Sequence, residues 1–289
     1  MTRIYLFPGQ GSQTPGMGRD LFARFPEQVA IADRVLGYSL TELCLEDPRG
    51  LLNQTLYTQP ALFVVNALTF LDHLVKTGEL PHIVAGHSLG EYNALFAASA
   101  IGFETGVRLV KRRAELMAEA RDGGMAAVIG LDVEKIRATL DRQGLDSIDI
   151  ANLNSPLQTV ISGPIADLDR AQSPLEQAGA MMFKKLPVSA AFHSRYMAEA
   201  ANRFERFLES VEIGIPRLPV ISNVTGSFHD PQTIKTMLSR QITHPVRWVE
   251  SVSTLKREPE PTFTELGPGT VLTGLNRRID METARATGH

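Results

Sequence analysis

Short apolar runs alternate along the chain with longer stretches of helix-like spacing. The β-rich runs lie at residues 3–7, 82–85, 218–222 and 262–265. This alternation is typical of a mostly parallel α/β sheet covered by helices. It predicts a large α/β part built from residues 1–123 and 189–289.

The middle of the chain follows a different order of elements. We expect strands at 125–130, 147–152, 158–162 and 180–187, with helices at 133–143 and 166–179. The order βαββαβ is the signature of a ferredoxin-like fold. It predicts a small inserted subdomain at residues 124–188, with a cleft where the two parts meet.

Composition and charge exclude several classes of protein. Hydrophobic residues make up 43% of the 289 positions and charged residues 21%, with a net charge of -3. This is a globular composition without the basic surplus of a nucleic-acid binder. The lone cysteine, Cys44, cannot form an intramolecular disulfide or a multi-cysteine zinc site, which indicates a reducing, cytoplasmic setting.

Neither a membrane span nor a targeting segment is predicted. The longest apolar stretch, Ala94 to Phe103, has about half of the ~20 residues that a spanning helix needs. The strand-like start at Ile4 also leaves no room for a leader. We expect the tail from Met281 to His289 to be frayed.

A candidate nucleophile lies in the sequence Gly86-His87-Ser88-Leu89-Gly90. It matches G-x-S-x-G, with a predicted strand before it and a predicted helix from Tyr92 to Ala100 after it. In this context Ser88 sits on a sharp strand-to-helix turn, and its small neighbours let the chains approach closely. The backbone N–H of Leu89 and the helix dipole can then stabilise an oxyanion. An ordinary glycine-flanked turn is the alternative.

The loop after the first strand is a candidate for the second oxyanion donor. Gly9 and Gly11 suggest a dinucleotide loop, but Thr14 replaces the third glycine and no acidic residue ends a second strand about 20 residues later. We interpret the loop as one that aims the backbone N–H of Gln10 at the serine.

The general base is expected among seven histidines. His193 leaves the predicted insert at the cleft, and its small and apolar neighbours keep it partly desolvated, so it is the candidate that activates Ser88. His87 is expected to pack behind the nucleophile, and the others to be structural or solvated. The acceptor that orients His193 stays open, either a carboxylate or a carbonyl. The remaining histidines are His73, His82, His229, His244 and His289.

A buried arginine is predicted on a helix at residues 105–120. At 100° per residue, Arg113 falls on the apolar face, whereas Arg112 falls on the polar face. A buried guanidinium is costly unless a carboxylate meets it, and its fork suits bidentate carboxylate binding. The two interpretations are a site for a substrate carboxylate and a structural salt bridge.

Four motifs together resemble malonyl-CoA:acyl carrier protein transacylases, most closely the free-standing trans-acting acyltransferases of modular polyketide synthases. The resemblance implies a hydrolase-like α/β core with a ferredoxin-like insert. It also implies that Ser88 is the nucleophile, His193 the base and Arg113 the malonate ligand. It also implies oxyanion amides at Gln10 and Leu89, a substrate glutamine at Gln59 and an orienting carbonyl at Gln241; Phe192 matches the pattern of malonyl selectivity. The motifs are Pro8-Gly9-Gln10-Gly11-Ser12-Gln13, Gly86-His87-Ser88-Leu89-Gly90-Glu91, Ala191-Phe192-His193-Ser194 and Glu265-Leu266-Gly267-Pro268-Gly269.

The resemblance implies a ping-pong transfer of malonyl from malonyl-CoA to the phosphopantetheine thiol of an acyl carrier protein, for polyketide or fatty acid biosynthesis. No metal or redox cofactor is implied, and no nucleic acid or membrane partner. Two alternatives stay open: an acyl hydrolase that clears carrier proteins, and a non-catalytic docking subunit of a synthase. Candidates for carrier docking are Lys184, Lys185, Arg112, Arg277 and Arg278.

Overall fold

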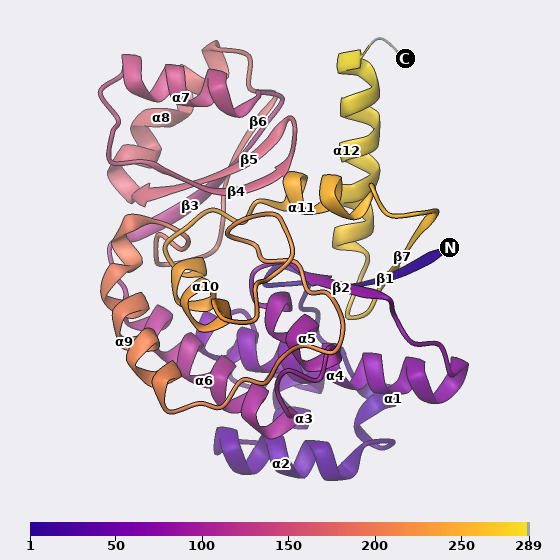
Figure 1. Ribbon diagram of the computed structural model, residues 1–289. Helices are drawn as coiled ribbons and strands as arrows, with labels where there is room; N and C mark the ends of the chain where they lie inside the picture. The colour runs from indigo at the N-terminus through magenta and orange to yellow at the C-terminus, as the bar shows by residue number, and fades with distance from the viewer. Residues whose placement is uncertain (288–289) are drawn as a thin grey trace.

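The computed structural model describes residues 1–287 and contains two β-sheets with helices around them (Figure 1). The sheets lie one above the other in this view, and the long C-terminal helix α12 runs beside both. The fold class predicted from the sequence, a mostly parallel α/β core with a smaller ferredoxin-like part, is confirmed. The boundary of the insert at residues 124–188 stays a prediction.

The large part is built around a three-stranded parallel sheet in the order β2-β1-β7. The central strand β1 (Thr2–Phe7) pairs with β2 (Ile83–Gly86) on one side and with β7 (Pro261–Glu265) on the other. From Ile4 to Phe7 every residue of β1 is buried. A continuous apolar run of this kind is expected where helices cover both faces of a parallel sheet.

The fourth strand predicted for this sheet, at 218–222, is wrong in extent. The segment makes only isolated bridges, Val220 with Val84 and Ile221 with Phe228. Pro219 accepts a hydrogen bond from the Val84 amide but has no N–H to return. A regular ladder therefore cannot extend along this segment.

Helices surround the large sheet and supply most of its core. The 23-residue helix α4 (Thr55–Thr77) packs mainly against α6 and α5, and its residues from Thr58 to Leu68 are all buried. The other helices are α1 (Arg19–Phe22), α2 (Pro26–Leu36), α3 (Leu40–Leu45), α5 (Gly90–Ala97), α6 (Phe103–Glu119), the 3-10 turn η1 (Arg195–Met197), α9 (Ala198–Glu209), α10 (Ile234–Gln241) and α11 (Trp248–Leu255).

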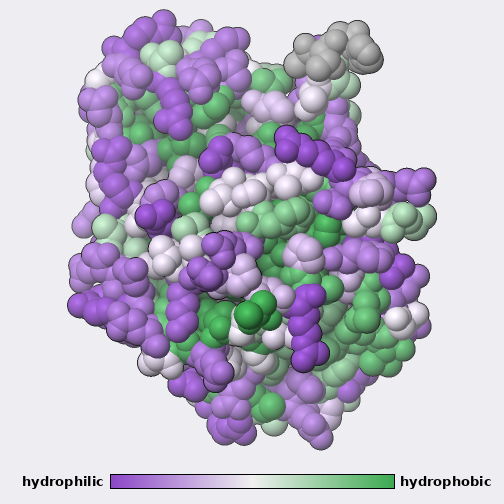
Figure 2. All heavy atoms as spheres, in the orientation of Figure 1, coloured by the Kyte–Doolittle hydropathy of each residue, from purple (hydrophilic) through white to green (hydrophobic). Residues whose placement is uncertain are grey.

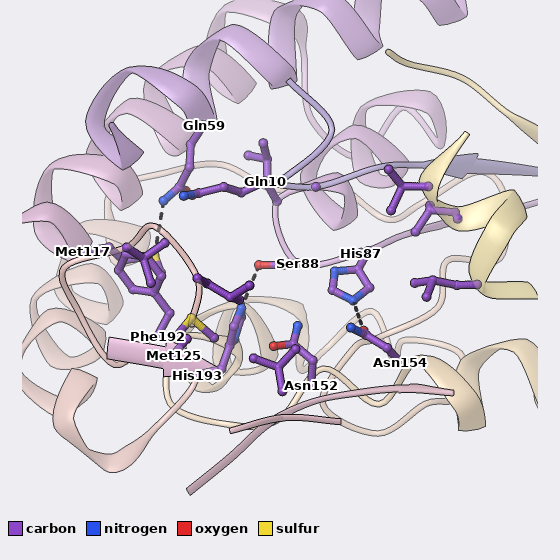
Figure 3. A pocket seen from close by; sticks show the side chains of 18 of the residues that line it. Gln10, Gln59, His87, Ser88, Met117, Met125, Asn152, Asn154, Phe192 and His193 are labelled. Atoms are coloured by element: carbon purple, nitrogen blue, oxygen red, sulfur yellow. Dashed lines mark hydrogen bonds between the residues drawn. The ribbon is translucent and has the colours of Figure 1, made fainter. Parts of the chain in front are cut away.

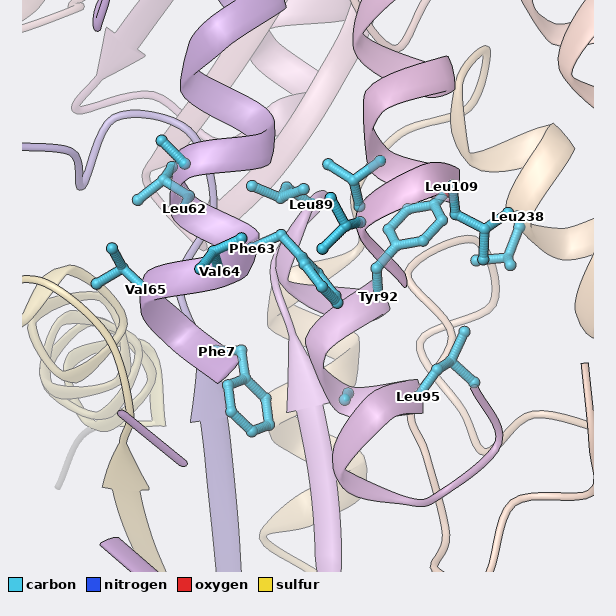
Figure 4. Packing of buried hydrophobic residues seen from close by; sticks show 14 of the residues in the cluster. Phe7, Leu62, Phe63, Val64, Val65, Leu89, Tyr92, Leu95, Leu109 and Leu238 are labelled. Atoms are coloured by element: carbon cyan, nitrogen blue, oxygen red, sulfur yellow. The ribbon is translucent and has the colours of Figure 1, made fainter. Parts of the chain in front are cut away.

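The packing around the nucleophile loop is aromatic and aliphatic (Figure 4). Phe7, Phe63 and Tyr92 are fully buried. Leu89 and Leu95 lie among them, so the chain just after Ser88 is anchored in the main core.

The outer surface, on the face drawn in Figure 2, is mostly hydrophilic with hydrophobic areas between. Within residues 1–287 no helix combines the length and apolarity of a membrane span.

The small sheet is antiparallel, in the order β4-β5-β3-β6. The helices α7 and α8 pack together, and α8 contacts three of its strands. The predicted order βαββαβ is confirmed. The elements are β3 (Gly123–Ile129), α7 (Val133–Arg142), β4 (Asp149–Ser155), β5 (Gln158–Pro164), α8 (Ile165–Gln177) and β6 (Met182–Lys185).

The prediction of a frayed tail is wrong for residues 281–287. They belong to α12 (Val271–Thr287), which is held at both ends. Glu265 accepts hydrogen bonds from the first amides of the helix, and Glu282 accepts them from Ser155 Oγ (2.7 Å) and the Leu157 amide (2.8 Å). The helix thus joins the large part to the β4–β5 hairpin. Residues 288–289, including His289, lie outside the described residues.

Candidate active site

Ser88 lies on the turn between β2 and α5, in a left-handed backbone conformation with φ of 51°. A side chain is strained in this region of φ. The turn closes only because the neighbours are small: a Cβ at Gly86 would overlap the backbone of Gly90, and one at Gly90 would overlap the Phe7 carbonyl. The sharp turn predicted from the motif is confirmed, and the role of Ser88 as nucleophile stays a prediction.

The serine and the candidate base meet across 105 residues of sequence. Ser88 Oγ lies 2.8 Å from His193 Nε2, and His193 Nδ1 lies 2.7 Å from the Gln241 carbonyl oxygen. Because that carbonyl only accepts, Nδ1 carries the proton and Nε2 faces the serine with its lone pair. The sequence left open whether a carboxylate or a carbonyl accepts from Nδ1 of His193, and the structure shows a carbonyl.

The environment of His193 keeps its ring neutral. Burial lowers its pKa from the ordinary value of 6.5 to about 3, and the positive charge of Arg113 adds to the effect. A neutral imidazole can accept a proton from a hydroxyl. His193 is 4% exposed and lines the cavity.

Arg113 points inward from α6, as the helical-face argument predicts, and is 1% exposed. The alternative of a structural salt bridge is wrong: within residues 1–287 Arg113 forms none. Nη1 donates to Gln59 Oε1, and Nη2 donates to Gln241 Oε1 (2.9 Å) and Ser88 Oγ (3.1 Å). The guanidinium is therefore held by neutral amides beside the nucleophile.

Two backbone amides near Ser88 are available to an oxyanion. Within the described part of the chain, the N–H groups of Gln10 and Leu89 donate no hydrogen bond. The loop that carries Gln10 is held from behind, because Asn66 Nδ2 donates to the Pro8 carbonyl at 2.9 Å. Thr55 Oγ1 donates to Gln10 Oε1 at 2.6 Å and fixes the side chain.

The sequence predicts that His87 packs behind the nucleophile, and this prediction is wrong. His87 borders the cavity beside Ser88 (Figure 3). Its Nε2 lies 2.8 Å from Asn154 Oδ1, and its ring contacts Trp248. Burial lowers its pKa. The residue thus links the serine loop to strand β4 of the small sheet.

The cavity lies between the serine loop, the small sheet and α12 (Figure 3). Phe192, the residue before the candidate base, is on its wall and is 6% exposed. Further lining residues are Gln10, Gln59, Met117, Met125, Asn152, Asn154, Gln158, Val160, Leu272 and Leu275. Across the described residues, no three His, Cys, Asp or Glu side chains come close enough to hold a metal ion.

Sequence reasoning missed a buried polar group behind the serine. The Ser88 amide donates to Asn223 Oδ1 at 2.6 Å, and Asn223 Nδ2 donates to the Gly86 carbonyl. Glu91 is fully buried and lies 2.6 Å from His229 Nε2, so the expectation that His229 is solvated or merely structural in a turn misses this contact. The one sequence signal for this buried carboxylate is the position of Glu91, about one helical turn after Ser88.

The fold, the serine loop and the buried arginine define an acyl transferase, and the chain belongs to the acyl transferase domain family, matched over residues 4–285. Among named relatives, it is 51% identical over 280 residues to BaeC of Bacillus velezensis, a polyketide biosynthesis malonyl CoA-acyl carrier protein transacylase. That match covers 96% of this chain and 97% of BaeC.

Two further similarities extend this result. ThaF of Burkholderia thailandensis, a polyketide biosynthesis protein, is 52% identical over 284 residues; the match covers 98% of this chain, but this chain spans only 25% of ThaF. The solved complex of the malonyl-transacylase PlMCAT with AntF, a type II polyketide synthase acyl-carrier protein, superposes with a TM-score of 0.92 at 39% identity, covering 96% and 93% of the two chains.

Proposed function

We propose that this protein transfers malonyl from malonyl-CoA to the phosphopantetheine thiol of an acyl carrier protein through a malonyl-serine intermediate. The observation that carries the proposal is that Ser88 Oγ contacts both a neutral imidazole and a guanidinium, at 2.8 and 3.1 Å. A base activates the serine, and a cation next to it suits a short acyl group that ends in a carboxylate.

In the first half-reaction Ser88 Oγ attacks the thioester carbonyl, and His193 Nε2 takes the hydroxyl proton. The amides of Gln10 and Leu89 hold the oxyanion. When the intermediate collapses, the carbon–sulfur bond breaks and the proton passes from His193 to the CoA sulfur. The malonyl group then remains on Ser88 as an ester.

In the second half-reaction the phosphopantetheine thiol gives its proton to His193 and its sulfur attacks the ester. Collapse returns the proton to Ser88 and releases malonyl on the carrier protein. Every proton in the cycle moves through one imidazole, so a bound metal or redox group has no step to perform. The Gln241 carbonyl holds the imidazole in the useful tautomer throughout.

Arg113 is proposed to bind the malonate carboxylate, with Gln59 and Gln241 as supports. Their amide oxygens leave the cation without a charged partner, so a substrate carboxylate gains a charge-assisted contact that a neutral acyl group does not. This favours transfer of malonyl over the hydrolysis of neutral acyl groups. The similarity to BaeC over its full length supports a role in polyketide biosynthesis.

An acyl carrier protein is the proposed partner, and the likeness to the complex of PlMCAT with AntF supports it. Of the basic candidates for docking, Lys185 pairs with Asp169 and Arg112 pairs with Glu115. Arg278 donates to Gln158 on the cavity wall. Lys184, on the exposed edge strand β6, is the better candidate for contact with an acidic carrier. A cytoplasmic location is proposed from the single, buried Cys44.

The test is the mass of the intact protein after incubation with malonyl-CoA. The unaltered protein should gain one malonyl group, and the Ser88→Ala variant should gain none while keeping its thermal stability. Adding a holo carrier protein should then remove the adduct and appear as malonyl on the carrier. Loss of the adduct to water at the same rate without carrier would indicate a hydrolase, and no adduct on the unaltered protein would indicate a docking subunit.

A further inference from the structure

A carboxylate with no exposed surface lies directly behind the proposed active site. Glu91, in the first turn of α5, is 0% exposed. Its Oε1 accepts from His229 Nε2 at 2.6 Å, and its Oε2 accepts from Gln241 Nε2 at 2.6 Å and from the Asn223 amide at 3.2 Å. A carboxylate accepts at both oxygens, and three donors meet the Glu91 carboxylate here.

The Gln241 side chain connects this carboxylate to Arg113. Because a carboxylate only accepts hydrogen bonds, the NH₂ end of Gln241 must face Glu91. The same NH₂ group donates to the Ser88 carbonyl at 2.9 Å, so the oxygen end faces Arg113 and accepts from Nη2, also at 2.9 Å. A single amide thus lies between a buried anion and a buried cation.

Within residues 1–287, neither Arg113 nor Glu91 contacts a carboxylate, lysine or arginine of opposite charge. Arg113 has no salt bridge among the described residues, and the partner of Glu91 is an imidazole. Nδ1 of His229 is buried without a hydrogen-bond partner in residues 1–287, which fits a neutral ring whose proton is on Nε2. Burial lowers the pKa of Arg113, and the nearby Glu91 charge opposes this shift. Glu91 is therefore a negative charge that one amide, that of Gln241, separates from the arginine.

We propose that Glu91 acts through the Gln241 amide as the counter-charge of Arg113 and thereby tempers the selectivity of the site for acyl groups that carry a carboxylate. The inference rests on the proposed function. With Glu91 present, the guanidinium tolerates burial even when a neutral acyl group occupies the cavity. Without that charge, binding a carboxylate becomes more favourable and binding a neutral group less so.

The direction of the effect distinguishes this role from a structural one. Damage to the network would slow acylation by charged and neutral thioesters in parallel, or would displace Arg113 and lower the preference for the charged one. Loss of the charge alone should raise that preference. At an effective dielectric constant of about 20, a unit charge on the far side of the Gln241 amide changes the ratio of malonyl to acetyl rates by about five- to thirtyfold.

Two variants isolate the charge from the hydrogen bonds. In His229→Gln, the new amide can donate to Glu91, so the carboxylate keeps a partner and its charge. In the double variant Glu91→Gln/His229→Gln, the two amides can bond to each other, and the oxygen of residue 91 can still accept from Gln241. The pair therefore differs by one negative charge.

The experiment measures single-turnover acylation of Ser88 by malonyl-CoA and by acetyl-CoA, using intact-protein mass spectrometry. Thermal unfolding confirms that each variant is folded. The ratio of malonyl to acetyl rates should be the same in His229→Gln as in the unaltered protein, and about five- to thirtyfold higher in the double variant. The single variant Glu91→Gln should move the ratio in the same direction.

An unchanged or lower ratio in the folded double variant would overturn the inference. A ratio that rises equally in His229→Gln would also overturn it, since that variant retains the charge. Failure of the unaltered protein to load malonyl on Ser88 is a separate outcome, because it rejects the proposed function before any variant is compared.

Discussion

Replacing Arg113 by alanine removes the group proposed to hold the substrate carboxylate and leaves the serine and the base in place. In the structure the guanidinium donates through both Nη atoms to Gln59, Gln241 and Ser88, so it presents two donors to the cavity. A hydrogen bond to a charged group contributes about 1.5–3 kcal/mol. Two lost bonds correspond to about 10²- to 10⁴-fold in the rate of malonyl transfer.

The assay is a competition between malonyl-CoA and acetyl-CoA for Ser88 in one reaction, with the two adducts resolved by intact-protein mass. Arg113→Ala should lose the malonyl adduct and keep or increase the acetyl adduct, because no buried cation is left unpaired by a neutral group. Some loss of stability is expected from the cavity that the truncation leaves.

The control is the neighbouring residue on the same helix. The Arg112 side chain is 33% exposed and pairs with Glu115 at 3.1 Å. Such a surface pair contributes about 0–1 kcal/mol. Arg112→Ala should therefore load malonyl at nearly the unaltered rate. Equal losses in the two variants would refute the assignment of the carboxylate site to Arg113.

Four more outcomes are expected. The rate of Ser88 acylation should not fall between pH 7 and pH 5, because burial and Arg113 lower the pKa of His193 to about 3; a fall centred near 6.5 would contradict this. Since the unfolded histidine binds a proton below about 6.5 and the folded one does not, the free energy of unfolding should drop as the pH falls from there toward 3. Gly90→Ala should destabilise the protein and slow acylation, because its methyl group would overlap the Phe7 carbonyl. Its control is Gly274→Ala, in open space on α12, which should raise the free energy of unfolding by about 0.5–1 kcal/mol. Calorimetry measures both. Malonyl should be preferred over methylmalonyl because Phe192 crowds the cavity wall, and equal loading of both thioesters by the unaltered protein would contradict that.

The parts of the site that local pattern determines could be predicted from the sequence. Ser88 follows from a strand, a turn and a helix within about ten residues, and the inward direction of Arg113 follows from helix geometry alone. The small sheet also follows from the order of its elements. Each of these depends on residues that are near one another in the chain.

The parts that could not be predicted depend on distant segments. Glu91 meets His229 across 138 residues and Gln241 across 150, and no pattern in the sequence joins them. Residues 281–287 are helical where Glu282 contacts the β4–β5 hairpin, a contact that periodicity cannot reveal. The strand expected at 218–222 has the right residues for pairing, but Pro219 removes a donor and interrupts its ladder.

The absence of a structural salt bridge at Arg113, within the described residues, has a physical reason that bears on the proposed function. A buried cation is most simply stabilised by a direct carboxylate, but such a partner would occupy the donors that a substrate carboxylate needs. Gln59 and Gln241 satisfy the same donors with neutral oxygens, which a charged ligand can outcompete. The compensating negative charge lies one amide further away, on Glu91, where it cannot block the guanidinium. A site that binds an anion beside a nucleophile gains from this separation, because the cation stays stable when the cavity is empty and available when the substrate arrives.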